Sequence, residues 1–350
     1  MKPLAISLAV SGVLALSPSL CSPGNEPKEP GVESAEIARL ASQSLLLDAA
    51  MAGSRMVVVG ERGHVLLSDD QGRTWRQSQV PTRSNLTGVF FLNAQLGWAV
   101  GHDEIIMRSE DGGETWTRQH YAPEKEQPLL DAWFGDADNG LAFGAYGTIL
   151  SSHDGGRTWS EQIFEPQPLI EKPAAAKAAA GKNKADEYDV EGAASDMHLN
   201  AVAPSADGKL YLAAEAGHLF RSDDNGATWL ELPSPYEGSF FGVLPLEPPS
   251  LLAFGLRGHL FRSDDAGATW QAIASNTTAM LTNAVQVDVE TIVITGLAGA
   301  LLVSHDGGRT FELRAQEDRK GFSAALPAEA SLVTVGEAGI KSIEMPGTTP

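Results

Sequence analysis

Six aspartates recur along the chain in the same chemical surroundings, and they are the first candidates for chemistry. Each lies in a Ser-x-Asp-x-Gly-x-Thr stretch that ends in an aromatic residue. These aspartates are Asp70, Asp111, Asp154, Asp224, Asp265 and Asp306. A short carboxylate in such a stretch accepts backbone N–H bonds across its own turn, and the serine does so more weakly. Gly156 and its counterparts supply the positive φ that the turn requires. The spacing therefore predicts structural hairpin locks.

The aromatic ends of these stretches lie at positions 75, 116, 159, 229, 270 and 311, mostly about forty residues apart. A fixed period of this length is typical of propellers and solenoids. The stretches resemble the Asp-box (BNR) repeat family, whose motif all six copies match, with Phe311 in place of Trp as the one departure. In that family the Asp box is a structural turn, so the resemblance implies architecture and leaves the chemistry to other residues.

A second recurring element is a Gly-x-x-Gly turn, with two looser versions, that occurs seven times. The fold does not require charged or aromatic side chains inside this turn, so we expect the variable side chains there to contact a partner. They are Glu61, Arg62, His102, Asp103, Tyr146, Glu215, Arg257 and Glu337. The recurrence of His64, His218 and His259 at one repeat position favours packing over zinc binding. We expect no metal site, cofactor or catalytic residue.

These turns require a frame of short strands, about four in each unit of forty residues. Seven Gly-x-x-Gly turns against six Asp boxes predict an all-β, seven-bladed β-propeller of four-stranded antiparallel blades, with six blades as the alternative. The last unit, Phe322–Met345, has three strand-like runs. We therefore expect Ala35–Ser44 to supply its fourth strand and to close the ring.

The innermost strand of each blade is crowded around the axis, so small residues are expected there. Candidates recur 26–28 positions before the aromatic anchor, and Ala324 would be the seventh. The first six are Ala49, Gly88, Ala132, Ala201, Gly242 and Ala284.

The segments outside the repeats suggest export. Residues 1–21 combine Lys2 with an apolar run too short to span a bilayer, as a signal peptide does. A lipid anchor at Cys21, the single cysteine, is the alternative to ordinary cleavage. We expect a flexible linker at 22–35, a propeller at 36–346 with a disordered insertion at 165–196, and a tail at 347–350.

The formal net charge of -20 argues against nucleic acid and against an anionic membrane surface as partners. From about Leu45 to Met345 the repeats resemble the photosystem II stability/assembly factor family. That resemblance implies an exported, non-catalytic scaffold that binds a protein client in a membrane or envelope complex, and we expect a monomer. The alternative is a sialidase-like glycoside hydrolase, with Arg62, Arg257 and Tyr146 at the channel mouth. Arg73, Arg157 and Arg309 are expected on the opposite, Asp-box face.

Overall fold

The structure is a computed structural model that describes residues 33–168, 197–329 and 331–344. Contacts divide the chain into Met1–Val32 and Glu33–Pro350, and every described residue belongs to the second unit. The expected signal peptide, most of the linker and of the insertion, and the tail lie outside the described residues. Among the described residues, no helix has the length and apolarity needed to cross a membrane.

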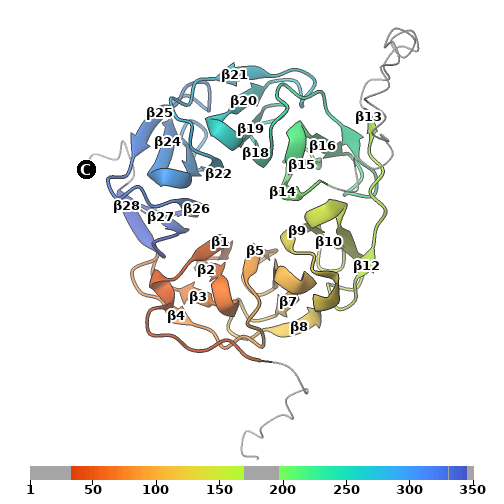
Figure 1. The fold of residues 1–350 in the computed structure, drawn as a ribbon, viewed down its shortest axis with the longest axis vertical. Coiled ribbons are helices and arrows are strands. Elements are labelled where there is room, and N and C mark those ends of the chain that lie inside the picture. Colours follow the sequence, from red (N-terminus) through yellow and green to blue (C-terminus); the bar gives the residue numbers. More distant parts are fainter. Residues whose placement is uncertain (1–32, 169–196, 330, 345–350) are drawn as a thin grey trace, which may run out of the picture. The chain divides into compact units, whose positions relative to one another are not determined.

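Seven sheets, the blades, follow one another along the chain and around a ring (Figure 1), and all their strand pairs but one are antiparallel. Blades one and two comprise β1 (Leu46–Ala52), β2 (Arg55–Gly60), β3 (Val65–Ser68), β4 (Arg76–Gln77), β5 (Leu86–Phe91), β6 (Gly97–Gly101), β7 (Ile106–Ser109) and β8 (Thr117–His120). Blades three and four comprise β9 (Leu129–Phe134), β10 (Gly140–Gly144), β11 (Ile149–Ser152), β12 (Ser160–Glu161), β14 (Leu199–Pro204), β15 (Leu210–Ala214), β16 (Leu219–Ser222) and β17 (Leu230–Glu231). Blades five, six and seven comprise β18 (Phe240–Pro245), β19 (Leu251–Gly255), β20 (Leu260–Ser263), β21 (Gln271–Ile273), β22 (Leu281–Gln286), β23 (Ile292–Gly296), β24 (Ala300–Ser304), β25 (Glu312–Ala315), β26 (Phe322–Pro327), β27 (Ser331–Gly336) and β28 (Lys341–Glu344). The prediction of a seven-bladed β-propeller is confirmed.

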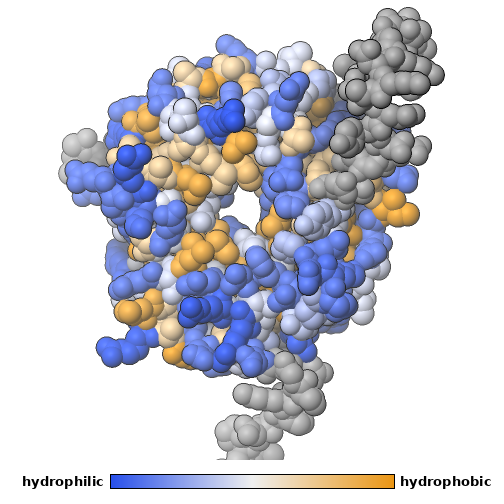
Figure 2. Space-filling view, in the orientation of Figure 1, coloured by the Kyte–Doolittle hydropathy of each residue, from blue (hydrophilic) through white to orange (hydrophobic). Residues whose placement is uncertain are grey.

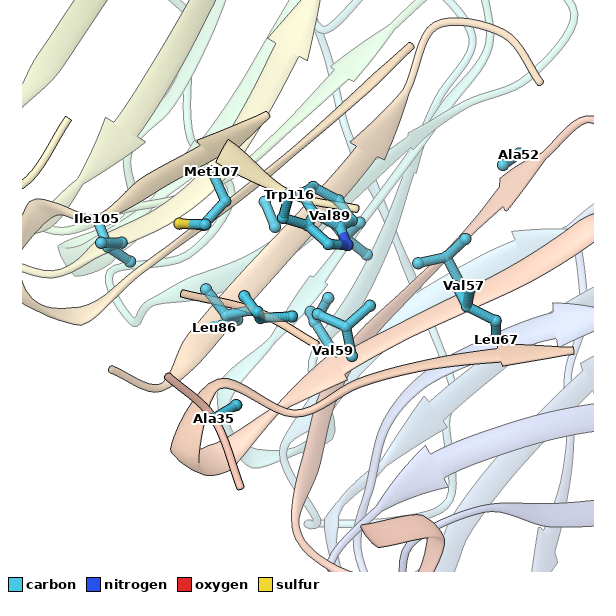
Figure 3. Packing of buried hydrophobic residues seen from close by; sticks show 13 residues of the cluster. Ala35, Ala52, Val57, Val59, Leu67, Leu86, Val89, Ile105, Met107 and Trp116 are labelled. Atoms are coloured by element: carbon cyan, nitrogen blue, oxygen red, sulfur yellow. The ribbon is translucent and has the colours of Figure 1, made fainter. Parts of the chain in front are cut away.

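The ring closes through the innermost strands. Each one packs against the innermost strand of the next blade, in the order β1, β5, β9, β14, β18, β22, β26 and back to β1. The second strands β6, β10, β15, β19 and β23 are buried along their whole length, because neighbouring blades cover both of their faces. Figure 3 shows one such layer between blades one and two, where Val57, Val59 and Leu67 face Val89 and Trp116. The core is therefore a series of apolar layers between blades.

Short 3-10 turns join the second strand to the third in six blades: η2 (Glu61–Gly63), η3 (His102–Glu104), η5 (Ala145–Gly147), η6 (Glu215–Gly217), η7 (Leu256–Gly258) and η8 (Leu297–Gly299). Two more 3-10 turns, η1 (Ala41–Gln43) and η4 (Pro123–Lys125), lie outside this set. Since strands alternate in direction, these second-to-third turns share one face with the blade-to-blade connections. We call it the η face. The Asp boxes lie on the opposite face.

The expectation that Ala35–Ser44 forms a fourth strand of the last blade is wrong. Blade seven contains three strands within the described residues. The segment instead packs as η1, with Ala41 buried beside Ala324 and Val335, and the backbone N–H of Ile340 donates to the carbonyl of Ser42 at 2.8 Å. Its beginning is tied to blade one, because the N–H of Ala35 donates to the carbonyl of Val80. The first and last blades are therefore held together by the packing of η1 on blade seven and of β1 on β26. They share no sheet among the residues that the structure describes.

The insertion begins with an ordered segment, which corrects its expected boundary. Strand β13 (Gln167–Pro168) pairs in parallel with β17 and makes blade four five-stranded. The rest of the expected insertion, up to residue 196, lies outside the described residues.

The small residues lie on the innermost strands as predicted, but three of them occupy a different register. A bulge near the start of each strand places Gly88, Ala201, Gly242 and Ala324 at one equivalent position. The residues at that position in the other blades are Asp48, Asp131 and Asn283, one residue before Ala49, Ala132 and Ala284. Two carboxylates, those of Asp48 and Asp131, therefore belong to residues at the position where a small side chain was expected.

Candidate functional site

All six Asp boxes form the predicted lock with nearly identical geometry. In the second box, Ser109 Oγ donates to Asp111 Oδ1 at 2.9 Å, and the N–H of Gly113 donates to Ser109 Oγ at 2.8 Å. Thr115 donates to both carboxylate oxygens, from its N–H at 2.9 Å and from its Oγ1 at 2.6 Å. Equivalent bonds hold Asp70, Asp154, Asp224, Asp265 and Asp306. These carboxylates are therefore occupied by their own turns.

The pKa values of these carboxylates agree with that structural role. Hydrogen bonds from the side chain and then the backbone of Thr74 lower the pKa of Asp70 to about 2. The backbone and then the side chain of Thr158 do the same for Asp154. Hydrogen bonds to the charged form of a carboxyl favour ionisation. A general acid needs the opposite shift, so these aspartates are poorly suited to acid catalysis.

The η face presents side chains from an unusual backbone conformation. The middle residue of each η turn has a positive φ, including 57° for Arg62, 63° for Asp103, 55° for Tyr146 and 57° for Arg257. A residue with a side chain adopts this left-handed conformation only at an energetic cost of about 1–2 kcal/mol. The final glycine of five of these turns also has a positive φ, and a Cβ on Gly63 would overlap the carbonyl oxygen of Thr82. The blade one turn is therefore packed directly against the connection beneath it.

The eight predicted contact residues divide into two groups. Asp103 accepts a 2.6 Å hydrogen bond from Ser84 Oγ, and Glu215 accepts one at 3.1 Å from the N–H of His198. Both carboxylates thus hold blade-to-blade connections. The other six are Glu61, Arg62, His102, Tyr146, Arg257 and Glu337; of these, Arg62, His102, Tyr146, Arg257 and Glu337 are exposed.

The structure spreads these residues around the ring and does not bring them together in one cluster. Arg62 lies in blade one, Tyr146 in blade three and Arg257 in blade five. The ring of Tyr146 contacts that of His198, with centroids 5.2 Å apart and planes at 89°. The arrangement that a sialidase mechanism needs, with arginines converging beside a tyrosine–carboxylate pair, is not formed by the residues that we predicted for it. Arg157 and Arg309 bond to their own Asp boxes, on the opposite face as expected.

An exposed apolar group on the η face was missed. Leu256 and Leu297 begin η7 and η8 in adjacent blades, and each is 36% exposed. Beside Leu297, a hollow of 650 Å³ is lined by Ala279, Ala298 and Leu313 and, on its other side, by Glu317 and Arg319. Figure 2 shows apolar surface gathered on this part of the face, next to the central opening. The sequence did carry a signal for this apolar group: leucine is the first residue of these two turns, where blades one and two have Glu61 and His102.

A buried carboxylate was also missed. Glu104 ends η3, where the other blades have glycine, with a φ of 48° and no exposed surface. Its Oε2 lies 3.0 Å from His120 Nε2 and 3.2 Å from Lys125 Nζ of η4. This cluster ties the blade two turn to the connection with blade three, and so positions His102 and Asp103.

Asp48 and Asp131 lie in the wall of the axial channel and each bridges two blades. Asp48 Oδ2 accepts a 2.8 Å hydrogen bond from the N–H of Val89, and Asp131 Oδ2 accepts one at 2.9 Å from the N–H of Val202. Desolvation, and then the charge of Asp131, raise the pKa of Asp48 to about 7. Desolvation raises the pKa of Asp131 to about 6. In the described part of the chain, no three His, Cys, Asp or Glu side chains are grouped so as to hold a metal ion.

Comparisons with known proteins agree with this architecture. A family model described as "Photosynthesis system II assembly factor YCF48" matches residues 68–129, which span the first two Asp boxes. No curated protein sequence matches the chain. The model match confirms the resemblance to a photosystem II assembly factor-like propeller that the repeats predicted.

Solved structures similar to this chain include two of YCF48. One is "YCF48 bound to D1 peptide", with a TM-score of 0.65 and 16% identity, covering 89% of this chain and 97% of that chain. The other is YCF48 from Cyanidioschyzon merolae, with the same TM-score and identity, covering 88% of this chain and 97% of that chain. The C-terminal WD40 domain of Sif2 has a TM-score of 0.59 at 11% identity, covering 86% of this chain and 82% of that chain. At these identities the likeness establishes the fold.

Proposed function

We propose that this protein is a non-catalytic assembly or stability factor that binds a protein client of a membrane or envelope complex through its η face. The observation that carries the proposal is the set of exposed side chains held on left-handed turns of this face. Backbone strain of this kind concentrates at functional sites, where the surrounding structure fixes it. Arg62, Tyr146 and Arg257 are presented in this way.

The comparisons support a protein client. One similar propeller of the same family was solved with a peptide bound, as its description states. A face that combines separated arginines with exposed Leu256 and Leu297 suits an extended peptide or tail, which can contact several blades at once. A small-molecule substrate would instead require convergent groups in one pocket.

We further propose that the protein acts as an exported monomer. The apolar run that follows Lys2 supports export, and the lipid anchor at Cys21 remains the alternative mode of membrane attachment. The client would then be an extracytoplasmic part of its complex.

Charge reversal on the η face tests the proposed function. We expect the double variant Arg62→Glu/Arg257→Glu to recover much less client than the wild type in affinity purification from the native host, with mass spectrometry as the readout. Its thermal melting should not change, because both side chains are exposed. The matched control is Arg73→Glu/Arg157→Glu, which makes the same charge change on the Asp-box face. Equal client recovery from both double variants would contradict the proposal.

A further inference from the structure

A recurring contact fills three of the slots between blades on the Asp-box face. In three of the six Asp boxes the carbonyl oxygen of the fourth residue accepts a hydrogen bond from an arginine of the preceding blade. Arg108 Nε donates to the carbonyl of Gly155 at 2.7 Å, and Arg262 Nη1 donates to that of Gly307 at 2.7 Å. Arg55 makes the corresponding bond to Gly112 at 3.1 Å. A guanidinium therefore occupies this slot between blades one and two, two and three, and five and six.

The guanidinium in these slots bridges two kinds of acceptor. Arg108 also pairs with the carboxylate of Glu110 at 2.5 Å, and Arg262 Nε donates to Asp264 at 2.9 Å. Both side chains are only 8% exposed. The planar fork of arginine suits such a site, because two of its N–H groups reach different acceptors at once.

The slot between blades three and four lacks this filling. Ser151 stands at the position of Arg108 and Arg262, directly before its Asp box, and Leu141 stands where Trp98 lies in blade two. Trp98 Nε1 contributes a second donor to Gly155, at 3.2 Å. Both replacements are smaller, and neither reaches the carbonyl of Asn225 as a donor. Gln162 Nε2 does cross the slot, but it donates to the next carbonyl, that of Gly226, at 2.7 Å. A pocket of 740 Å³ consequently opens between blades three and four.

The open slot keeps the acceptor. Asn225 is the fourth residue of the Asp box in blade four, it lines the pocket, and no described residue donates a hydrogen bond to its carbonyl. Asp136 and Asp224 also line the pocket, their carboxylates already accepting bonds from Asn139 and Thr228, and so does Lys209, which pairs with Asp207; the floor includes Leu141 and Leu210. Such a floor suits the methylene stem of an arginine, and the rim suits its charged head.

We propose that this slot binds the guanidinium of an arginine side chain presented by a partner protein, in the place that Arg108 and Arg262 fill from within the chain. The slot lies on the Asp-box face and is therefore separate from the η face proposed for the client. The net charge of -20 would favour the approach of an arginine-bearing surface.

The test uses the full-length protein, labelled with ¹⁵N, and two small probes. Nα-acetyl-arginine-N-methylamide should shift the amide signals of Asn225, Gly226 and Ser151 in a saturable way. The citrulline analogue has nearly the same shape without the charge, so it should shift them much less. No selective shift, or equal shifts with both probes, would overturn the proposal.

Two variants locate the binding. Ser151→Arg should fill the slot from within and weaken the arginine probe at least about tenfold, because the probe then competes with a tethered charge-assisted hydrogen bond. Gln95→Arg adds the same charge to an exposed turn on the same face and should leave binding unchanged. Undiminished binding by a folded Ser151→Arg protein, with folding checked by thermal melting, would also overturn the proposal.

Discussion

At the scale of single residues, the Asp box keeps the same internal hydrogen bonds in every blade, while the residues around it differ from blade to blade. Every Asp box keeps the same serine, aspartate and threonine bonds, within about 0.2 Å across the six copies. The residue directly before the box varies freely, from Arg108 to Ser151. The repeated residues of the Asp box therefore stabilise every blade in the same way, and the residues next to the box make one blade differ from another.

The first prediction concerns one lock. Asp111→Ala should destabilise the protein by about 1–2 kcal/mol, because the N–H and hydroxyl of Thr115 lose their acceptor in the turn. Urea unfolding measures the change. Asp138→Ala is the control, since this exposed turn aspartate makes no side-chain hydrogen bond with a described residue. A similar loss in both variants would show that the lock contributes little.

At the scale of elements, the η turns are fixed by the connections on which they rest. In three of them, those closed by Gly63, Gly217 and Gly258, the glycine has a positive φ and its Cβ position is occupied by a backbone carbonyl of the next connection. Gly63 and Gly258 illustrate this, since each lies against a threonine carbonyl. The turn and the connection therefore form a single unit.

The second prediction separates two contributions to the cost of replacing such a glycine: the steric clash of the added Cβ and the left-handed φ. Gly63→Ala should cost about 3 kcal/mol, because a steric clash with Thr82 adds to the left-handed φ of 71°. Gly208→Ala should cost only about 1 kcal/mol, since Gly208 has a φ of 84° but nothing within 4 Å of its Cβ position. Chemical denaturation of both variants measures the difference, and equal costs would mean that the connection yields to the added methyl group.

The elements could be predicted from the sequence where the determining contacts are local. The Asp box and the Gly-x-x-Gly turn each lie within a few residues, so their number gave seven blades. The fourth strand expected from Ala35–Ser44 depended on a contact across the whole chain, and the segment satisfies its hydrogen bonds as η1 instead. Edge pairing is decided by tertiary packing, on which a local pattern carries no information.

The candidate site was predictable only in part for a related reason. The exposed turn residues, such as Arg62 and Tyr146, were found because the repeat defines their position. Asp48 and Asp131 were missed because small residues were sought anywhere within 26–28 positions before the aromatic anchor, and Ala49 and Ala132, one residue further along the chain, also fall in that window. Because the bulge recurs in every innermost strand, a spacing of 28 positions, or 27 in blade one, marks the equivalent residue without regard to its size.

At the scale of the whole molecule, two sets of carboxylates oppose each other in their response to pH. The depressed pKa values of Asp70 and Asp154, about 2, add stability above pH 3.8 that is lost as the pH falls toward 2. Asp48 and Asp131 have raised pKa values, so the folded protein holds protons that the unfolded chain has released. Their contribution is lost as the pH rises from about 4 through 6 and 7.

The third prediction tests the channel carboxylates. Wild-type stability should fall between pH 4.5 and pH 8, and Asp48→Asn should reduce this fall, because an amide keeps an acceptor for Val89 without a charge to desolvate. Urea midpoints at the two pH values measure the effect. Asp138→Asn, at an exposed turn, should retain the wild-type slope. Parallel slopes for Asp48→Asn and the wild type would contradict the raised pKa.

Within the described residues, the strands of each blade follow one another in the sequence with no strand of another blade between them, since the last sheet takes no strand from the beginning of the chain. A gene segment that encodes one repeat therefore encodes one whole blade. Duplication or deletion of such a segment would add or remove one blade of the ring and would leave no strand without its sheet. The architecture thus leaves the number of blades open to evolutionary change by whole steps.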